Sequence, residues 1–365
     1  MPNVAPANTH LTMELKHGRP LIGCRFDPTG RYLFASAEDD TIQRFDLLTG
    51  DKTALLGHKS WTRGLACVPS KHTSIVPHAL ISASAVVGGN TSVRKPTPFT
   101  LLSCDYHGQL LWWNGADETP KPTRSITAHE GWIRAVAVSP DGATISTCGN
   151  DLLVKLWNFA DGRLLRTIEG HTSHVYNVAF HPNGQRLVSA DLKGNIKDWE
   201  IATGKLMREL DAKVLHKYDN GFGADIGGIR SIAFNSAGTQ LACIGITNVS
   251  NAFAGVGNPL VVLFDWADGK PKLLKPKDVF QGTGWGVSIH ANGFVVGAGG
   301  GGQGRIWFWN PTDATNTHTF NVPTNARDMA MHPDGTTLAI AGANGSSFLY
   351  AMTSAPPAPI TAKQP

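Results

Sequence analysis

The sequence predicts an all-β fold made of repeated units. Hydrophobic residues make up 41% of the 365 residues and charged residues only 16%, and the chain contains 40 glycines and 22 prolines. This composition suits many short strands joined by tight turns better than it suits helices. The second observation is a sequence pattern that recurs every 42 residues. A fixed period of this length indicates one supersecondary unit copied along the chain.

The repeat is clearest in two consecutive copies. Each copy opens at a histidine, contains a Pro-Asp-Gly or Pro-Asn-Gly turn, and closes on a tryptophan followed by a polar residue. The matching positions are 42 residues apart throughout: His129 and His171, Gly142 and Gly184, Trp157 and Trp199. Weaker copies bring the count to seven, with closing aromatic residues at Phe45, Trp113, Phe264, Trp309 and Tyr350. The X-Gly turns within each copy supply the backbone freedom that hairpins need.

This pattern resembles WD40 repeats, whose unit of ~40–45 residues forms four strands. The resemblance covers nearly the whole chain and implies a seven-bladed β-propeller of four-stranded antiparallel blades. The last repeat, from Ala326 to about Met352, has three strands before a Pro/Ala-rich segment. Residues 10–15 precede the first unit as residues 163–168 precede His171. We therefore expect the N-terminal strand to complete the last blade and close the ring.

The domain organisation follows from the repeat. We expect residues 1–353 to form a single propeller and residues 354–365 to form a Pro/Ala-rich disordered tail. Extra residues separate the repeat elements at about 69–98, 217–227 and 247–259. Inserted loops of such length inside a compact domain are usually functional or mobile. The sequence does not say which face of the ring the insertions cover.

The resemblance also implies a structural hydrogen-bonded tetrad in the third unit, formed by His129, Thr147, Asp151 and Trp157. A hydroxyl, an imidazole and a carboxylate also make a hydrolase triad, but the tetrad is the favoured interpretation. When the other units are matched by their spacing from the closing aromatic residue, the tetrad is incomplete. The position of the aspartate is taken by His107 in the second unit and by Lys193 in the fourth, and the first unit has Ala35 and Phe45 in place of the hydroxyl and the tryptophan. We expect only the third unit to be complete.

One column of the aligned repeats is hard to explain by packing alone. Seven residues at the starts of the innermost strands share this position: Ile22, Arg63, Arg134, Tyr176, Arg230, Trp285 and Arg327. Trp61 and Trp132 stand two residues before the arginines of their units. In WD40 proteins these positions surround the mouth of the central channel, on a face commonly used for partners. Arginine and tryptophan are also the residue types most enriched in binding hot spots.

We therefore predict a partner-binding face for an acidic or carboxylate-bearing segment of another protein. Its expected residues are Trp61, Arg63, Trp132, Arg134, Tyr176, Arg230, Trp285 and Arg327. The alternative is that each arginine pairs with a neighbouring carboxylate or carbonyl inside the channel. The sequence thus favours a non-catalytic interaction scaffold. The competing hypothesis is a propeller enzyme of the hydrolase or lactonase type with its site at the channel, for which the columns offer only His174 and Asp328.

No catalytic residue, metal site or cofactor is predicted. The formal G-x-G-x-x-G of residues 297–304 precedes a strand-like segment rather than a helix, so a flexible turn is favoured over a nucleotide site. The five cysteines form no CxxC pair and are expected to be small core residues. A net charge of +4 without a run of five basic residues argues against nucleic acid as a partner. No signal-like segment and no run of 18 apolar residues occurs, so we expect no membrane partner and a cytoplasmic location.

Overall fold

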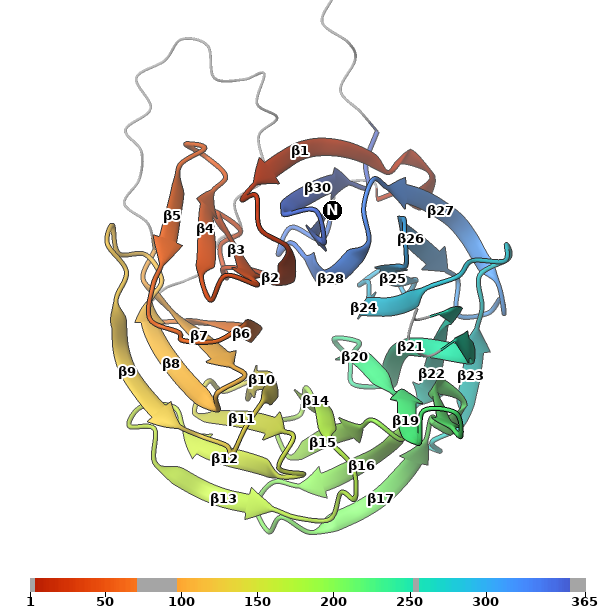
Figure 1. Ribbon diagram of the computed structural model, residues 1–365, viewed down its shortest axis with the longest axis horizontal. Helices are drawn as coiled ribbons and strands as arrows, with labels where there is room; N and C mark the ends of the chain where they lie inside the picture. The colour runs from red at the N-terminus through yellow and green to blue at the C-terminus, as the bar shows by residue number, and fades with distance from the viewer. Residues whose placement is uncertain (1–3, 71–96, 252–255, 355–365) are drawn as a thin grey trace, which may run out of the picture.

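The computed structural model describes residues 4–70, 97–251 and 256–354. In this part of the chain, seven four-stranded antiparallel sheets stand around a central axis like the blades of a propeller (Figure 1). The first strand of each blade lines the axis, and the fourth lies on the perimeter. The predicted all-β, seven-bladed propeller is therefore confirmed. Helical structure in the described residues is limited to single turns, Pro6–Asn8 and Lys213–Leu215, and none of it is long and apolar enough to cross a membrane.

Blades 1 to 4 follow one another in chain order, each running from the axis to the perimeter. Blade 1 contains β2 (Leu21–Phe26), β3 (Tyr32–Ala37), β4 (Ile42–Asp46) and β5 (Lys52–Leu55). Blade 2 contains β6 (Thr62–Pro69), β7 (Phe99–Asp105), β8 (Gln109–Asn114) and β9 (Pro122–Thr127). Blade 3 contains β10 (Ile133–Val138), β11 (Thr144–Gly149), β12 (Val154–Asn158) and β13 (Leu164–Ile168). Blade 4 contains β14 (Val175–Phe180), β15 (Arg186–Asp191), β16 (Asn195–Glu200) and β17 (Leu206–Asp211).

Blades 5 to 7 complete the ring, with one hairpin inserted between blades 4 and 5. The hairpin pairs β18 (His216–Asp219) with β19 (Ala224–Gly227). Blade 5 contains β20 (Ile229–Phe234), β21 (Gln240–Asn251), β22 (Val256–Asp265) and β23 (Pro271–Leu274). Blade 6 contains β24 (Thr283–Ile289), β25 (Val295–Gly300), β26 (Gly304–Trp309) and β27 (Asn316–Val322). Blade 7 contains β28 (Ala326–Met331), β29 (Thr337–Gly342), β30 (Ser346–Ala351) and β1 (His10–Lys16).

The outermost strand of blade 7 thus comes from the other end of the chain. β1 pairs antiparallel with β30, with His10 opposite Ala351 and Lys16 opposite Ser346. The Oγ of Ser346 donates a 2.7 Å hydrogen bond to the carboxylate of Glu14, which adds a side-chain contact to the ladder. The pairing leaves blade 7 with four strands, like the other six (Figure 1).

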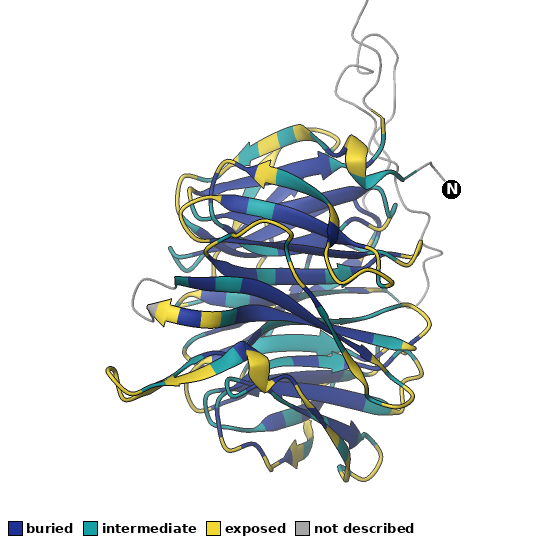
Figure 2. Cartoon of the chain, turned by 90° about the vertical axis from the view of Figure 1, so that its right-hand side faces the viewer, coloured by how far each residue is buried: buried dark blue, intermediate teal, exposed yellow. Residues whose placement is uncertain are grey.

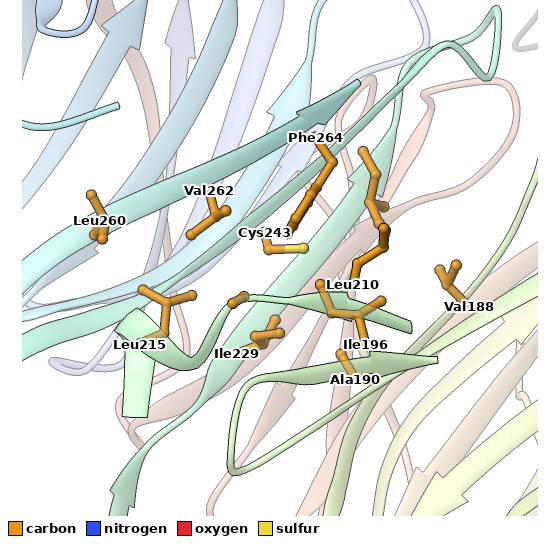
Figure 3. Packing of buried hydrophobic residues seen from close by; sticks show 12 residues of the cluster. Val188, Ala190, Ile196, Leu210, Leu215, Ile229, Cys243, Leu260, Val262 and Phe264 are labelled. Atoms are coloured by element: carbon orange, nitrogen blue, oxygen red, sulfur yellow. The ribbon is translucent and has the colours of Figure 1, made fainter. Parts of the chain in front are cut away.

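The core consists of seven apolar clusters, and each lies between two neighbouring blades. Between blades 4 and 5, for example, Ile196 and Leu210 pack against Cys243, Val262 and Phe264 (Figure 3). Buried residues follow the strands while exposed residues gather in the connecting loops (Figure 2). Because neighbouring blades cover both faces of each sheet, the second and third strands of the blades are mostly buried, and the stability of the ring is shared among all seven interfaces.

The insertions of blade 5 lie at one end of the channel. β21 and β22 continue their pairing beyond Gly245, the partner of the first residue of β20, so residues 247–251 and 256–259 are strand and not the loop that we expected. The β18–β19 hairpin packs beside them, and Lys217 Nζ donates a 2.7 Å hydrogen bond to the carbonyl of Val249. The insertion at 69–98 leaves blade 2 at Pro69, the opposite end of β6 from Arg63. Residues 71–96, and the tail from residue 355, lie outside the described residues.

The glycine-rich segment is a hairpin rather than a flexible turn alone. Its first four residues end β25, and its last begins β26. A Cβ built on Gly299 would lie 2.2 Å from the carbonyl oxygen of Thr283, so no larger residue fits beside β24. Four of the five cysteines are buried in the apolar clusters, and only Cys67 is partly exposed. Burial raises the pKa of the Cys104 thiol to about 12, consistent with its role as a packing residue.

Candidate functional site

The four residues of the predicted tetrad lie together inside blade 3. His129 contacts Thr147 Oγ1 through Nε2 at 2.7 Å and the Asp151 carboxylate through Nδ1 at 2.9 Å. Trp157 Nε1 donates to the same Thr147 oxygen at 2.8 Å. The chain of donors therefore runs from tryptophan to threonine to histidine to aspartate, with His129 neutral and protonated at Nδ1.

The hydroxyl and imidazole of this tetrad are buried. Thr147 is 0% exposed, so no substrate can reach its hydroxyl. Burial lowers the pKa of His129 in spite of its carboxylate partner. For Asp151, burial is the largest single effect and favours a higher pKa, but the hydrogen bond and charge of His129, the N–H of Leu153 and the charge of Lys155 together hold the pKa below the ordinary value. The network satisfies buried polar groups and joins β11, β12 and the turn between them to the segment before blade 3.

The expectation that only blade 3 has a complete tetrad is wrong. In blade 4, His171 contacts Ser189 Oγ at 2.6 Å and the carboxylate of Asp191 at 3.0 Å, and Trp199 donates to Ser189. In blade 2, His58 contacts Ser103 at 2.6 Å and Asp105 at 2.8 Å, and Trp113 donates to Ser103. Three consecutive blades therefore contain the full network.

The aspartates of blades 2 and 4 were missed because they stand two residues earlier than Asp151. Asp105 and Asp191 are the last residues of β7 and β15, whereas Asp151 lies in the turn after β11. Blade 3 has Gly149 at the strand end, where a Cβ would lie 3.3 Å from the ring nitrogen Nδ1 of His129. Either position brings a carboxylate to the histidine. In blade 1 only the contact between His17 Nε2 and Asp39, at 2.8 Å, is present.

The seven aligned residues of the predicted face share one backbone feature. Each is the residue that the strand pairing skips, the extra residue of a β-bulge near the start of an innermost strand; the skipped residues are Ile22, Arg63, Arg134, Tyr176, Arg230, Trp285 and Arg327. A bulge takes a residue out of the ladder and re-aims its side chain. Each of the seven blades therefore uses a β-bulge to present one side chain at the channel mouth.

Five of these side chains form a continuous belt of alternating arginine and aromatic residues, which we call the belt: Arg63, Trp285, Arg230, Tyr176 and Arg134. The Arg134 guanidinium carbon lies 4.6 Å from the centre of the Tyr176 ring, and that of Arg230 lies 5.0 Å from Tyr176 and 5.1 Å from Trp285. Arg63 of blade 2 lies 5.6 Å from Trp285 of blade 6, so the belt spans the channel. Cation–π contacts of this kind hold guanidinium planes rigidly.

A row of three aromatic residues adjoins the belt: Trp61, Tyr106 and Trp132, which we call the aromatic row. Tyr106 stacks on Trp132 with ring centres 4.0 Å apart, and Arg134 lies 4.4 Å from the Trp132 ring. Trp61 and Trp132 remain 43% and 41% exposed although they are large and apolar. Large exposed aromatic residues beside a cationic cluster are typical of binding surfaces.

Sequence reasoning missed Tyr106. It follows the tetrad serine Ser103 by three residues, and the equivalent residues are Glu38 in blade 1 and Asn150 in blade 3. The sequence signal for this position is the constant offset of three residues. In the structure, the backbone N–H of each of these residues donates a hydrogen bond to the carbonyl two residues before the bulge, at Pro20, Trp61 and Trp132 respectively. This second column therefore faces the same mouth. Asn150 accepts a 2.8 Å hydrogen bond from Arg134 Nε.

The structure separates Arg327 from the other predicted residues. Its guanidinium forms an ion pair with Glu38 of blade 1, and it does not line the cavity at the belt. Here the alternative interpretation, an arginine paired inside the channel, is correct. In the part of the chain that the structure describes, Arg63, Arg134 and Arg230 have no such carboxylate partner.

The belt and Tyr106 enclose a cavity of about 100 Å³ at the mouth. A second cavity of about 80 Å³ continues along the channel past Arg25, and Asp328 is the only acidic residue among those lining either cavity. The carboxylate of Asp328 accepts a 2.9 Å hydrogen bond from the N–H of Cys24. Burial lowers the pKa of the Arg134 guanidinium, and the charge of Arg63 lowers it further. The channel mouth is thus a confined region of positive charge.

Potential metal-ligating side chains are not clustered in the described part of the chain. Across residues 4–70, 97–251 and 256–354, no group of three or more His, Cys, Asp or Glu side chains is placed to hold a metal ion. His174 lies near Arg134, and burial followed by that positive charge lowers its pKa. Among the described residues, neither His174 nor Asp328 belongs to such a group.

Comparison with known proteins identifies a repeat family that matches part of the chain. The family model of the WD domain, G-beta repeat, matches residues 120–158 and 162–197. Each matched segment begins near the outermost strand of one blade and extends to the third strand of the next. Two segments of this seven-bladed propeller therefore match WD40 repeats.

Several curated WD40-containing relatives match parts of this propeller. Polyadenylation factor subunit 2 of Candida albicans is 36% identical over 67 residues, which are 18% of this chain and 12% of the relative. Apoptotic protease-activating factor 1 of Rattus norvegicus is 24% identical over 176 residues, 44% of this chain and 14% of the relative. Nuclear distribution protein nudF of Emericella nidulans is 24% identical over 147 residues, 38% and 30% of the two chains. The matches span less than a third of each relative's length.

Proposed function

We propose that this WD40 propeller is a non-catalytic protein-interaction platform that binds an acidic segment of a partner protein at the channel mouth. The observation that carries the proposal is the belt: three arginines from three blades, stacked between aromatic rings, with no carboxylate partner among the described residues. A planar guanidinium that is already held in place loses little entropy when it binds a carboxylate.

The surroundings of the belt extend the surface. The aromatic row gives exposed apolar area on the side of blades 2 and 3. On the side of blade 5, the β18–β19 hairpin and the extended β21–β22 pair rise at the same end of the channel, with Tyr218 and Phe222 exposed. A positively charged centre flanked by aromatic residues matches the anatomy of a docking surface for a negatively charged peptide.

The test compares two triple variants of equal charge change. Replacing Arg63, Arg134 and Arg230 with Glu reverses the belt, and replacing Arg124, Arg163 and Arg166 with Glu reverses three arginines on or beside the perimeter strands β9 and β13. Both variants are checked for folding by circular dichroism and thermal unfolding. Binding of fluorescein-labelled Glu/Asp-rich peptides and of their Gln/Asn counterparts is then measured by anisotropy.

We expect the acidic peptides to bind the wild type and the perimeter variant within a factor of about two, and the belt variant at least about tenfold more weakly. Pull-downs from lysate of the source cell should lose the same partners with the belt variant only. Equal binding by both variants would overturn the proposal. So would a single-stranded RNA oligonucleotide that binds the belt more tightly than every acidic peptide.

A further inference from the structure

Each of the three belt guanidiniums lies beside at least one aromatic ring, and its contacts within the described structure use only part of its five N–H groups. Arg134 stacks against Tyr176 and Trp132, and Arg230 lies between Tyr176 and Trp285. The N–H bonds of a guanidinium lie in its plane, so a contact through the face satisfies none of them. The only hydrogen bond to an amide or carboxylate within this group, in the described structure, is that from Arg134 to Asn150.

Two buried donors at the cavity have no acceptor. Arg230 Nε and Trp285 Nε1 are both shielded from solvent, and in the described residues neither has a hydrogen-bond partner. Both residues line the cavity of about 100 Å³. Buried N–H groups without a partner are rare in folded proteins, and a polar ligand is one of the ordinary ways in which they are satisfied.

The charge of the cavity calls for an anion. Burial lowers the pKa of the Arg230 guanidinium, and the nearby charges of Arg63 and Arg134 lower it further. No acidic side chain lines this cavity, so three cations face one small space without compensation. A bound anion would offset both the burial and the mutual repulsion.

The volume of the cavity and the directions from which the arginines approach it indicate the kind of anion that it can bind. A space of about 100 Å³ suits a group of a few heavy atoms, since pockets for drug-sized ligands are ~300–1,000 Å³. The arginines approach from three blades, 2, 3 and 5, and therefore from three directions. A carboxylate has two oxygens in one plane, whereas a phosphate group presents at least three strong acceptor oxygens in three dimensions.

We propose that the cavity at the belt binds a tetrahedral oxyanion of the phosphate class through Arg63, Arg134, Arg230 and the indole N–H of Trp285. The phosphate belongs either to a small molecule or to a phosphorylated residue of the partner segment. Only the second source rests on the proposed function, because a free phosphate needs no peptide-docking surface.

The first experiment uses inorganic phosphate, with sulfate, acetate and chloride at equal ionic strength. Binding to the purified full chain is followed by isothermal titration calorimetry and by tryptophan fluorescence. We expect saturable 1:1 binding of phosphate and sulfate, and about tenfold weaker binding of acetate. Absence of saturable phosphate binding, or acetate binding as tight as phosphate binding, would overturn the proposal.

Variants locate the site. Arg230→Lys keeps the charge but loses the planar fork, and Trp285→Phe keeps a ring but loses the indole N–H; each should weaken phosphate binding about tenfold. Arg124→Met is the matched control, because Arg124 also stacks on a tryptophan, Trp112 at 5.4 Å, but on the perimeter. It should bind phosphate like the wild type. A loss of the same size in Arg124→Met, or no loss in either belt variant, would contradict the assignment.

A phosphoserine peptide and its unphosphorylated form distinguish the two sources. Tighter binding of the phosphopeptide, displaced by inorganic phosphate, places a partner's phosphate in the cavity. If free phosphate binds and no peptide does, the oxyanion site stands and the docking function fails. If acidic peptides bind but phosphate neither binds nor competes, the docking function stands and the oxyanion site is refuted.

Discussion

The imidazole Nε2 of His332 lies 3.0 Å from the carbonyl oxygen of Gly30 and donates a hydrogen bond to it. His332 follows β28 in blade 7 and Gly30 lies in the turn between β2 and β3 of blade 1, so this contact joins blade 1 to blade 7, which contains both β1 and β30. The same contact recurs between His181 and Gly238, and between His290 and Gly335. Gly30 has a φ of 79°, and a Cβ built on it would lie 2.0 Å from the His332 ring.

We predict that His332→Ala destabilises the propeller by about 2–4 kcal/mol, because it removes a buried hydrogen bond and an edge contact with Phe26 and leaves a cavity. The free energy of unfolding, measured by urea denaturation, checks this value. His107→Ala serves as the control, since His107 is exposed in the turn after β7, and should change stability by less than about 0.5 kcal/mol. Equal effects would mean that the blade contact contributes nothing.

The tetrads of blades 2 and 4 give a second prediction. Asp191→Ala should cost about 2–4 kcal/mol, because it leaves His171 and the backbone N–H groups of Lys193 and Asn195 without their acceptor. Lys193→Ala, at the position that spacing alone assigns to the tetrad, should cost less than about 1 kcal/mol, since the Lys193 side chain is 40% exposed and its ion pair with Asp225 is partly screened by solvent. Thermal and urea unfolding of both variants measure the difference. A larger loss in Lys193→Ala would restore the assignment by spacing.

We predict that the free energy of unfolding decreases in two steps as the pH is lowered. Burial lowers the pKa of His129, so the unfolded chain takes up that proton first, and stability declines as the pH falls below about 6.5. The pKa values of Asp105, Asp151 and Asp191 are also lowered, because the hydrogen bonds and charges around each carboxylate together outweigh the effect of burial, which is the largest single one. Their stabilisation is complete above the ordinary aspartate pKa of about 3.9 and is lost as the pH falls through the folded-state values.

Urea midpoints measured in steps from neutral to acidic pH test this dependence. His129→Gln should reduce the slope in the first window, at about pH 5–6.5, and leave the acidic step in place. A variant whose pH profile is parallel to that of the wild type would show that His129 does not contribute.

Tyr106 should position Arg134 for binding. Tyr106→Ala removes the ring that stacks on Trp132 and lies 5.7 Å from the Arg134 guanidinium, and should weaken acidic-peptide binding about fivefold. Tyr106→Phe keeps the ring and should bind like the wild type in the anisotropy assay. Weak binding by the Phe variant as well would assign the effect to the hydroxyl instead of the stack.

The repeat period was enough to predict the blades, but it could not locate every side chain. The 42-residue spacing depends on turns and closing aromatic residues, which keep it between blades 3 and 4, whereas insertions lengthen it in blades 2 and 5. The tetrad carboxylate has two solutions, at the strand end in Asp105 and Asp191 or in the turn in Asp151. Counting back from the closing tryptophan with the spacing of blade 3 finds only the position in the turn. The three blades share the hydrogen bond between histidine and aspartate, although the aspartate stands at different sequence positions.

The belt shows a second limit of sequence reasoning. The column of bulge residues could be predicted because each residue has the same offset within its repeat. The residues that meet across the channel could not be predicted, because their contacts depend on neighbours at other positions of the repeat. Glu38 draws Arg327 into an ion pair, whereas Tyr106 and Tyr176 hold Arg134 beside the cavity.

The pairing of β1 with β30 also affects how the molecule is made. Glu14 and Ser346, which meet across this ladder, are 332 residues apart in the chain. At ~5–20 residues per second, synthesis would separate their emergence from the ribosome by roughly 20–70 s. During that time β1 has no partner strand, and its alternating polar residues Thr12, Glu14 and Lys16 would keep it soluble as a single strand. The blade that carries both ends of the chain is therefore the last to be finished, and a nascent propeller waits as an open arc until β30 arrives.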